Sequence, residues 1–327
     1  MVGMRFVDAG DRQLTSVDML AAQRKAGSKD VEIARGDLAR ILYEATSNDV
    51  EYVFGDTVQA IAEDTGGVEV SFEHQPARRF DLVVGADGMH SGVRRLVFGP
   101  ERQFVRFKQH YFAVATADIG LGDSHWITFY NTPGKAAGIS RPASGPAQAY
   151  FTFRSEAPLA IDYRDLAGQR RLVHEAFSGT GWHVPALLAA MEGAPDFYFD
   201  ALSQVQMPAW SKGRVALVGD AAYCASPAAG AGALLSLIGA YRLAGELAAS
   251  PGDHRTGLAR YEAAHRPLVA QKQAQLFTGI LVPRTRLGIR LRNAVVGSPL
   301  LSLMAALAPG KLDPLPGYDF AGAALAI

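Results

Sequence analysis

The sequence predicts an α/β fold in which a parallel sheet is interrupted by an inserted α+β domain and followed by C-terminal helices. Two apolar runs, Leu82–Gly85 and Arg214–Gly219, have the pattern of strands buried in a parallel sheet. Each leads through glycine and aspartate toward a helical pattern, whereas the residues between them alternate like half-buried strands. We therefore predict one discontinuous domain at residues 1–100 and 207–280, an insertion at 101–206, and C-terminal helices at 281–327.

The composition points to a small-molecule partner. The 32 basic and 32 acidic residues cancel, so no overall field favours nucleic acid or an anionic membrane. The single cysteine, Cys224, excludes an internal disulfide framework and is expected to be a small buried residue. The N-terminal residues lack the features of a signal peptide, and we expect a cytoplasmic protein without a metal site.

The first hundred residues predict strands around one helix. Residues 1–16 alternate like a hairpin, and Asp37 is placed to act in the first turn of a helix that begins near Leu38. A turn at Gly66-Gly67 is expected to join two of the strands. The strands predicted by alternation or by apolar character are Val31–Ala34, Val50–Phe54, Val58–Ala62 and Val68–Phe72.

The remaining elements follow the same rules of periodicity. A long helix is predicted at Gly232–Ala249, and an apolar helix at Pro299–Ala308 is about half the ~20 residues that span a bilayer. In the insertion we predict strands at Tyr111–Asp118, Trp126–Tyr130 and Gln148–Phe153 and helices at Leu166–Phe177 and Val184–Met191.

The strongest motif follows the strand that ends near residue 219. Gly219-Asp220 is followed by Pro227 and by Gly230-Ala231-Gly232 at the start of a helix. Glycines let a backbone approach a ligand closely, and a helix N-terminus offers unpaired N–H groups to a phosphate. The carboxylate of Asp220, at the end of the strand, could accept a hydrogen bond from a sugar hydroxyl. A simple capped strand-to-helix loop is the alternative.

A second turn follows the strand at 82–85. Asp87-Gly88 is followed by Ser91 and Arg94 on the first turns of a predicted helix. Ligands of open α/β sheets bind at the carboxyl ends of the strands, so this turn and the one at Gly219-Asp220 are expected to converge on one cofactor. Taken alone, the motif also fits a capped helix start.

The two motifs resemble the DG and GD fingerprints of class A flavoprotein monooxygenases, the family of para-hydroxybenzoate hydroxylase and of tetracycline-degrading monooxygenases. Arg35, in Ala-Arg-Gly-Asp-Leu-Ala-Arg, resembles the family's FAD-contacting arginine. The three segments agree with the family in order and spacing. The resemblance implies an FAD-binding Rossmann-like sheet with an inserted substrate domain.

The resemblance also implies roles for individual residues. Asp220 would accept hydrogen bonds from the FAD ribityl chain, and Asp87, Gly88 and Arg35 would lie near the pyrophosphate. The DG turn is also linked in the family to NAD(P)H use. Val58 would contact adenine through its backbone. The remaining positions implied to lie against FAD are Gly219, Ala221, Ala222, Pro227, Gly230, Ala231 and Gly232.

One family feature is not found in this sequence. Family members carry a GxGxxG loop after their first strand, and neither Gly230-Ala-Gly-Ala nor Gly120-Leu-Gly-Asp has the third glycine. We therefore expect an N-terminally truncated version of the sheet, with exposed apolar faces and unpaired strand edges.

The function implied by the resemblance is hydroxylation of a small aromatic or polyketide-like substrate with NAD(P)H and dioxygen, through a flavin hydroperoxide. Such chemistry requires no side-chain nucleophile, and no GxSxG, HExxH or Walker A motif is found. Aromatic residues at Tyr111–Phe112, Trp126–Tyr130 and Tyr150–Phe153 are candidates for the substrate wall, although most are expected to be core.

Two other functions stay open from the sequence. One is a different FAD-dependent oxidoreductase of the same fold, such as a dehydrogenase-like enzyme or a halogenase. Against a halogenase, Trp126, Trp182 and Trp210 stand apart rather than in a tryptophan-rich motif. The other is a non-catalytic remnant that binds FAD weakly or not at all. A purified chain that is yellow and consumes NAD(P)H with substrate would exclude the remnant.

Overall fold

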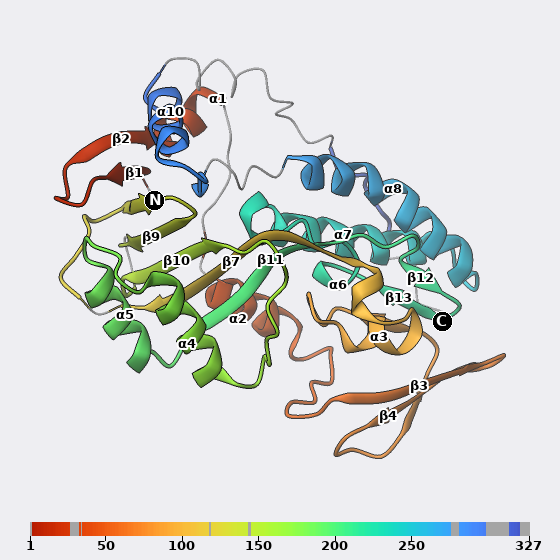
Figure 1. Cartoon of the computed structure of the whole chain (residues 1–327). Helices are drawn as coiled ribbons and strands as arrows, with labels where there is room; N and C mark the ends of the chain where they lie inside the picture. The colour runs from red at the N-terminus through yellow and green to blue at the C-terminus, as the bar shows by residue number, and fades with distance from the viewer. Residues whose placement is uncertain are drawn as a thin grey trace. The chain divides into compact units, whose positions relative to one another are not determined.

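The computed structural model describes residues 2–26, 33, 35–117, 119–142, 145–275, 281–298 and 314–320. The chain forms two compact units, whose elements are drawn in Figure 1. The first unit comprises residues 1–34, 109–202 and 277–313, and the second comprises residues 35–108, 203–276 and 314–327. The boundaries at 108/109 and 202/203 fall inside strands β7 (Val105–Thr116) and β11 (Tyr198–Val205).

The first unit is built on a seven-stranded sheet in the order β11-β7-β10-β9-β8-β1-β2. β7, β10, β9 and β8 pair antiparallel in turn, β8 pairs parallel with β1, and β1 pairs antiparallel with β2. Its other elements are β1 (Gly3–Val7), β2 (Gln13–Asp18), α1 (Met19–Ala26), β8 (Trp126–Thr132), β9 (Lys135–Ser140), β10 (Gln148–Arg154), α4 (Leu166–Phe177), α5 (Val184–Gly193) and α10 (Arg286–Val296).

Alternation along the strands gives this sheet two different faces. Tyr111, Phe151 and Phe153 point to the face that packs on α4, where the rings of Phe151 and Phe177 lie 5.1 Å apart. Phe6 and Phe129 form a second apolar cluster near α10, and the guanidinium of Arg292 lies 3.6 Å from the centre of the Phe6 ring. Helices on both faces therefore cover this sheet.

The second unit contains two three-stranded sheets, in the orders β12-β13-β6 and β3-β4-β5. A core of buried residues from β4, β13, α7 and α8 lies between its elements. Those elements are α2 (Arg35–Thr46), β3 (Val58–Asp64), β4 (Gly67–Phe72), β5 (Arg78–Phe80), β6 (Val83–Gly85), α3 (Gly92–Val97), β12 (Ser211–Lys212), β13 (Val215–Leu217), α6 (Asp220–Tyr223), α7 (Gly232–Ala248) and α8 (His254–Ala274), with 3₁₀ turns at Glu101–Gln103 and Pro227–Ala229.

Local side-chain chemistry explains several element boundaries. Asp64 Oδ1 accepts hydrogen bonds from the N–H groups of Gly66 and Gly67, which fixes the β3–β4 turn. Asp165 caps α4 by accepting from Gly168 N at 2.8 Å, and Thr285 caps α10 by accepting from Gly288 N at 3.0 Å. These boundaries follow from the sequence without reference to distant residues.

Most predicted elements are confirmed, but the grouping of residues 1–34 and the strand at Val50–Phe54 differ from the prediction. Residues 1–34 group with the inserted region rather than with residues 35–100, because β1 pairs with β8 in register from Gly3↔Trp126. Val50–Phe54 is not a strand. It has no strand partner among the described residues, and Tyr52 and Phe54 stack on each other instead, with ring centroids 5.8 Å apart. The predictions at Val31–Ala34 and Pro299–Ala308 lie outside the described residues, apart from the isolated Ile33.

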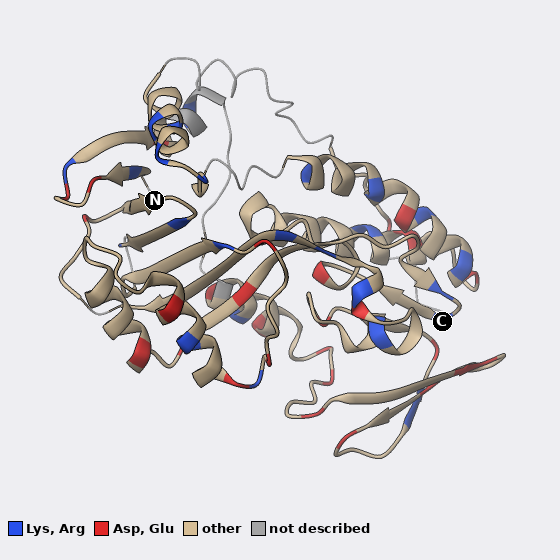
Figure 2. Cartoon of the chain, viewed as in Figure 1, with Lys and Arg blue, Asp and Glu red and all other residues tan. Residues whose placement is uncertain are grey.

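The surface of the second unit carries exposed apolar residues at one sheet edge and on one helix. β6 ends the β12-β13-β6 sheet, and its Val84 is 40% exposed rather than buried on both faces as predicted. Ile41 and Leu42 on α2 and Phe54 after it are also exposed. Figure 2 shows acidic and basic residues interspersed over the chain. None of the described helices is long and apolar enough for a bilayer.

Candidate cofactor-binding site

Parallel pairing of β6 and β13 brings the two glycine-aspartate turns together. Val83 pairs with Val215 and Gly85 with Leu217, so both strands end at the same edge of the sheet. Val218 N donates to Gly85 O at 3.0 Å, which extends the pairing to the first residue beyond β13. The two turns therefore lie at the same sheet edge, although the motifs are far apart in the chain.

The Asp87 turn is built as a capped helix start. The Asp87 carboxylate accepts hydrogen bonds from Ser91 Oγ at 2.5 Å and from Val93 N at 3.0 Å. Ser91 Oγ in turn accepts from Arg94 N at 2.9 Å, so two side chains satisfy the first turn of α3. Gly88 has a φ of +81°, and a Cβ added to it would meet no atom within 4 Å, so its backbone faces open space. Asp87 thus shapes the turn, and Gly88 leaves it accessible.

The Gly219 turn depends on glycine and presents an aspartate without a partner. Gly219 has a φ of +66°, and a Cβ there would lie 2.9 Å from Ser236 Oγ, so a larger residue would be strained. Asp220 is half-buried in the first position of α6. Among the described residues, no donor is hydrogen-bonded to its carboxylate. This carboxylate is therefore available to hydroxyl groups of a ligand.

The loop that follows leads into a helix N-terminus without a side-chain cap. Pro227 opens a 3₁₀ turn that ends at Gly230, which has a left-handed φ of +61°. Ala231 precedes α7 and cannot cap it with a side chain, so the first N–H groups of the helix lack that partner. Gly232 lies beside Asp220, since a Cβ on it would be 3.8 Å from Asp220 Oδ1. Free N–H groups and a free carboxylate therefore lie next to each other.

Arg94 joins the two turns through the interior of the unit. Its side chain is fully buried, and Nη1 donates to Ala221 O at 2.9 Å while Nη2 donates to Met89 O at 2.5 Å. Glu101 lies 3.5 Å from the same Nη2. Burial lowers the pKa of the guanidinium, and the nearby carboxylates of Glu101 and Asp87 oppose that shift. From the sequence Arg94 is placed only on the first turns of α3, whereas the structure shows that its side chain contacts both turns.

A cluster of four buried side chains supports the Gly219 turn, and the sequence did not reveal it. Its members are Trp210, Tyr223, Tyr261 and His265. Tyr261 Oη donates to Leu217 O at 3.0 Å and lies 3.2 Å from Tyr223 Oη. Trp210 and His265 pack against Tyr223, with ring centroids 4.5 and 4.9 Å away. Both tyrosine pKa values are raised by burial, so the hydroxyls stay protonated. The order of these residues in the chain gave no signal of this cluster because it forms only when α8 packs on α6 and α7.

Because His265 of this cluster is buried, we predict that the folded chain loses stability in mild acid. Burial, with a smaller contribution from Arg242, lowers the pKa of His265 to about 4, below its unfolded value near 6.5. The unfolded chain therefore binds the proton first as the pH falls, and stability present above pH 6.5 is lost progressively down to pH 4, by about 3 kcal/mol. Urea unfolding at pH 7.0 and 4.5 measures this loss. In the His265→Phe variant the difference between the two pH values should shrink, and an unchanged difference would contradict the assignment.

The structure says less about the other residues that were predicted to contact the cofactor. Arg35 is the first residue of α2, and its side chain lies outside the described part of the structure. Val58 begins β3 in the separate β3-β4-β5 sheet of the same unit. Ala221 and Ala222 are fully buried in α6, so only their backbone can face a ligand, and Ala221 O is already taken by Arg94. Cys224 is buried and accepts a hydrogen bond from Ser226 N at 3.4 Å.

These groups fit a dinucleotide cofactor such as FAD. The uncapped start of α7 and the glycine backbone at Gly230 and Gly232 suit a pyrophosphate, and the unpartnered Asp220 suits a polyol hydroxyl. The described residues contain no group of three or more His, Cys, Asp or Glu side chains that could hold a metal ion.

The aromatic residues considered for a substrate wall differ in burial. Tyr111, Phe129, Phe151 and Phe153 are buried in the core. Phe112 and Tyr150 are half-buried on the other side of their strands, and the register places Phe112 beside Thr152 and Tyr150 beside Val114. Among the candidates considered, Phe112, Trp126, Tyr130 and Tyr150 therefore retain accessible aromatic surface.

Comparison with known proteins gives a consistent result. The FAD binding domain family model matches residues 10–275. An uncharacterized protein of Mycobacterium tuberculosis, MT1298, is 42% identical over 273 residues, which cover 83% of this chain and 73% of the relative. A flavin-dependent monooxygenase from an unknown prokaryotic organism is 38% identical over 273 residues, covering 83% and 70% respectively. The crystal structure of tetracycline destructase Tet(51) matches 97% of this chain and 81% of its own, with a TM-score of 0.79 and 32% identity.

Proposed function

The chain belongs to the FAD-binding family of flavin-dependent monooxygenases, and from this membership we propose that it hydroxylates a small aromatic or polyketide-like substrate with electrons from NAD(P)H. The observation that carries the proposal is the Asp220 carboxylate, which receives no hydrogen bond from the part of the chain that the structure describes, beside the start of α7, which has no side-chain cap. A site with both groups at one strand edge suits the ribityl and pyrophosphate portions of FAD.

We assign the second unit to the cofactor. Asp220 accepts hydrogen bonds from ribityl hydroxyls, and the N–H groups at Gly230–Gly232 approach the pyrophosphate. Asp87 and Gly88 extend the site on the neighbouring strand, with Arg35 and Val58 as further contacts. Bound FAD supplies the redox chemistry that passes electrons from NAD(P)H to dioxygen. The protein binds and orients the reactants and excludes water, so it needs no side-chain nucleophile.

We assign the first unit to the substrate. Phe112 and Tyr150 provide accessible aromatic surface on one face of the seven-stranded sheet, which suits stacking with a flat ring system. The similarity to a tetracycline destructase, whose name denotes action on a fused-ring polyketide, supports the same substrate class. The half-buried hydroxyl of Tyr150, which donates to Gln148 Oε1 at 2.8 Å, adds a polar group to this surface.

Substrate-dependent oxidation of NAD(P)H tests the proposed reaction. The chain, purified with added FAD, is incubated with NADPH or NADH, ¹⁸O₂ and a panel of phenolic and fused-ring compounds. We expect one class of compound to accelerate NAD(P)H oxidation and to gain a single ¹⁸O atom by mass spectrometry. Oxidation that releases only hydrogen peroxide with every compound, or a product without ¹⁸O, would contradict hydroxylation.

A further inference from the structure

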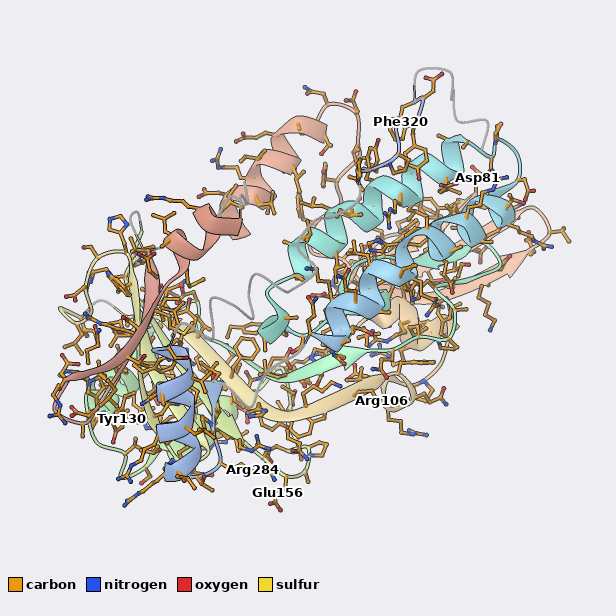
Figure 3. The ribbon with its side chains drawn as sticks, turned by 90° about the horizontal axis from the view of Figure 1, so that it is seen from above. Asp81, Arg106, Tyr130, Glu156, Arg284 and Phe320 are labelled. Atoms are coloured by element: carbon orange, nitrogen blue, oxygen red, sulfur yellow. The ribbon has the colours of Figure 1, made fainter. Side chains whose placement is uncertain are left out.

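A cavity of about 390 Å³ lies in the first unit, in a part of the fold that the flavin proposal does not use. It is lined by the β8–β9 turn at Gly134, the end of β10 at Arg154, Ser155 and Glu156, and Arg284 just before α10. Figure 3 labels Arg284 and Glu156, which lie near one another in that view. Segments that are far apart in the sequence therefore build one concave surface.

Two guanidinium groups meet in this cavity. Arg154 Nη2 and Arg284 Nη2 both donate to Gln109 Oε1, at 3.0 and 3.3 Å. Burial and, after it, the neighbouring charge of Arg284 lower the pKa of Arg154, whereas the carboxylate of Glu156 opposes that shift. In the described residues neither guanidinium forms an ion pair with a carboxylate, although Glu156 lies at the cavity wall. The pair thus has an excess of positive charge and unused N–H donors.

The scaffold holds one of these groups in place. Arg154 Nη1 lies 3.1 Å from Nε2 of His110, which is 1% exposed, so the ring accepts this hydrogen bond in its neutral form. Gln109 adopts a left-handed φ of +58°, an uncommon conformation for a non-glycine residue, and its carbonyl accepts from Ser155 N at 3.0 Å. The backbone at 109 and 155 is therefore tied together, and Arg154 is oriented before any ligand arrives.

We propose that this cavity binds the phosphate group of a ligand. A phosphate carries close to two negative charges at neutral pH and accepts paired hydrogen bonds from planar guanidinium groups, which matches two arginines that share the cavity with a single carboxylate, that of Glu156. Arg284 is exposed and can change rotamer to close on the anion, whereas Arg154 is fixed by His110 and Gln109. Flavin binding is not required for this site.

Calorimetric titration of the chain with inorganic phosphate, in a chloride-containing buffer without other phosphates, tests this site. We expect measurable binding that weakens at least about tenfold in Arg284→Gln, because one charged donor is lost. The control is Arg286→Gln, which removes the same charge from an exposed position two residues away that does not line the cavity. Arg154→Lys keeps the charge but loses the planar guanidinium that can donate two parallel hydrogen bonds. We expect it to weaken phosphate binding by less than Arg284→Gln.

Competition identifies the source of the phosphate. NADPH differs from NADH by one phosphate, so displacement of phosphate by NADPH but not by NADH would place a nucleotide phosphate in the cavity. Binding of phosphate without competition from either nucleotide would assign the cavity to free phosphate or another ester. The proposal is overturned if the unmodified chain does not bind phosphate, or if Arg284→Gln and Arg286→Gln weaken binding equally.

Discussion

The Asp220→Ala variant is expected to bind FAD about 10- to 100-fold more weakly than the unmodified chain. The substitution removes a charged acceptor, and a hydrogen bond to a charged group contributes about 1.5–3 kcal/mol. Since the described residues supply no donor to this carboxylate, its removal should leave the thermal unfolding temperature nearly unchanged. Titration of FAD by tryptophan fluorescence, alongside a thermal melt without FAD, measures both quantities.

The matched control for this variant is Asp81→Asn. Asp81 is an exposed aspartate just before β6, at the strand end opposite to the turns. The substitution removes one negative charge from the same unit without touching the proposed cofactor groups. Equal weakening of FAD binding by Asp220→Ala and Asp81→Asn would mean that Asp220 acts only through net charge, and the assigned hydrogen bond would be wrong.

The Arg94→Gln variant is expected to lose about 3 kcal/mol of stability. Its guanidinium is fully buried and donates to the carbonyls of Met89 and Ala221, and a shorter neutral side chain would leave at least one of them unpaired. Because these bonds join the two turns, FAD binding should weaken along with stability. Urea unfolding, followed by circular dichroism, measures the first effect.

Arg95→Gln is the control for the Arg94 variant. Arg95 is the next residue on α3 and is exposed, so its replacement is expected to change the free energy of unfolding by no more than about 0.5 kcal/mol. A loss in Arg95→Gln as large as in Arg94→Gln would show that α3 is sensitive to any loss of positive charge. Arg94 would then not be the specific link between the two turns.

Much of the fold could be predicted because local signals were strong. α4 begins and ends at Leu166 and Phe177 as its periodicity predicts, and Asp165 provides its cap. The prediction for Val50–Phe54 was wrong because alternation gives the preference of a segment and not the presence of a neighbouring strand. The membership of residues 1–34 in the first unit depends on parallel pairing with β8, which no local pattern encodes.

In the candidate site, too, some features could be predicted from the sequence and others required the structure. The turns at Asp87-Gly88 and Gly219-Asp220 were identifiable because glycine and aspartate at a strand end have direct conformational causes, and β6–β13 pairing brings them together. The internal use of the Asp87 carboxylate and the bridging by Arg94 required the structure, since both depend on side-chain directions. Tyr261 and His265, on α8, were not identified because only tertiary packing places them below the turn.

Hydrogen–deuterium exchange with and without saturating FAD tests most directly whether the two turns form one cofactor site. Peptides that cover residues 219–234 report the uncapped start of α7, and peptides that cover residues 85–94 report the turn on the neighbouring strand. We predict slower exchange in both regions when FAD is present, while peptides of α4 in the other unit stay unchanged. Exchange that is unaffected by FAD at residues 219–234 would contradict the assignment of the cofactor to these turns.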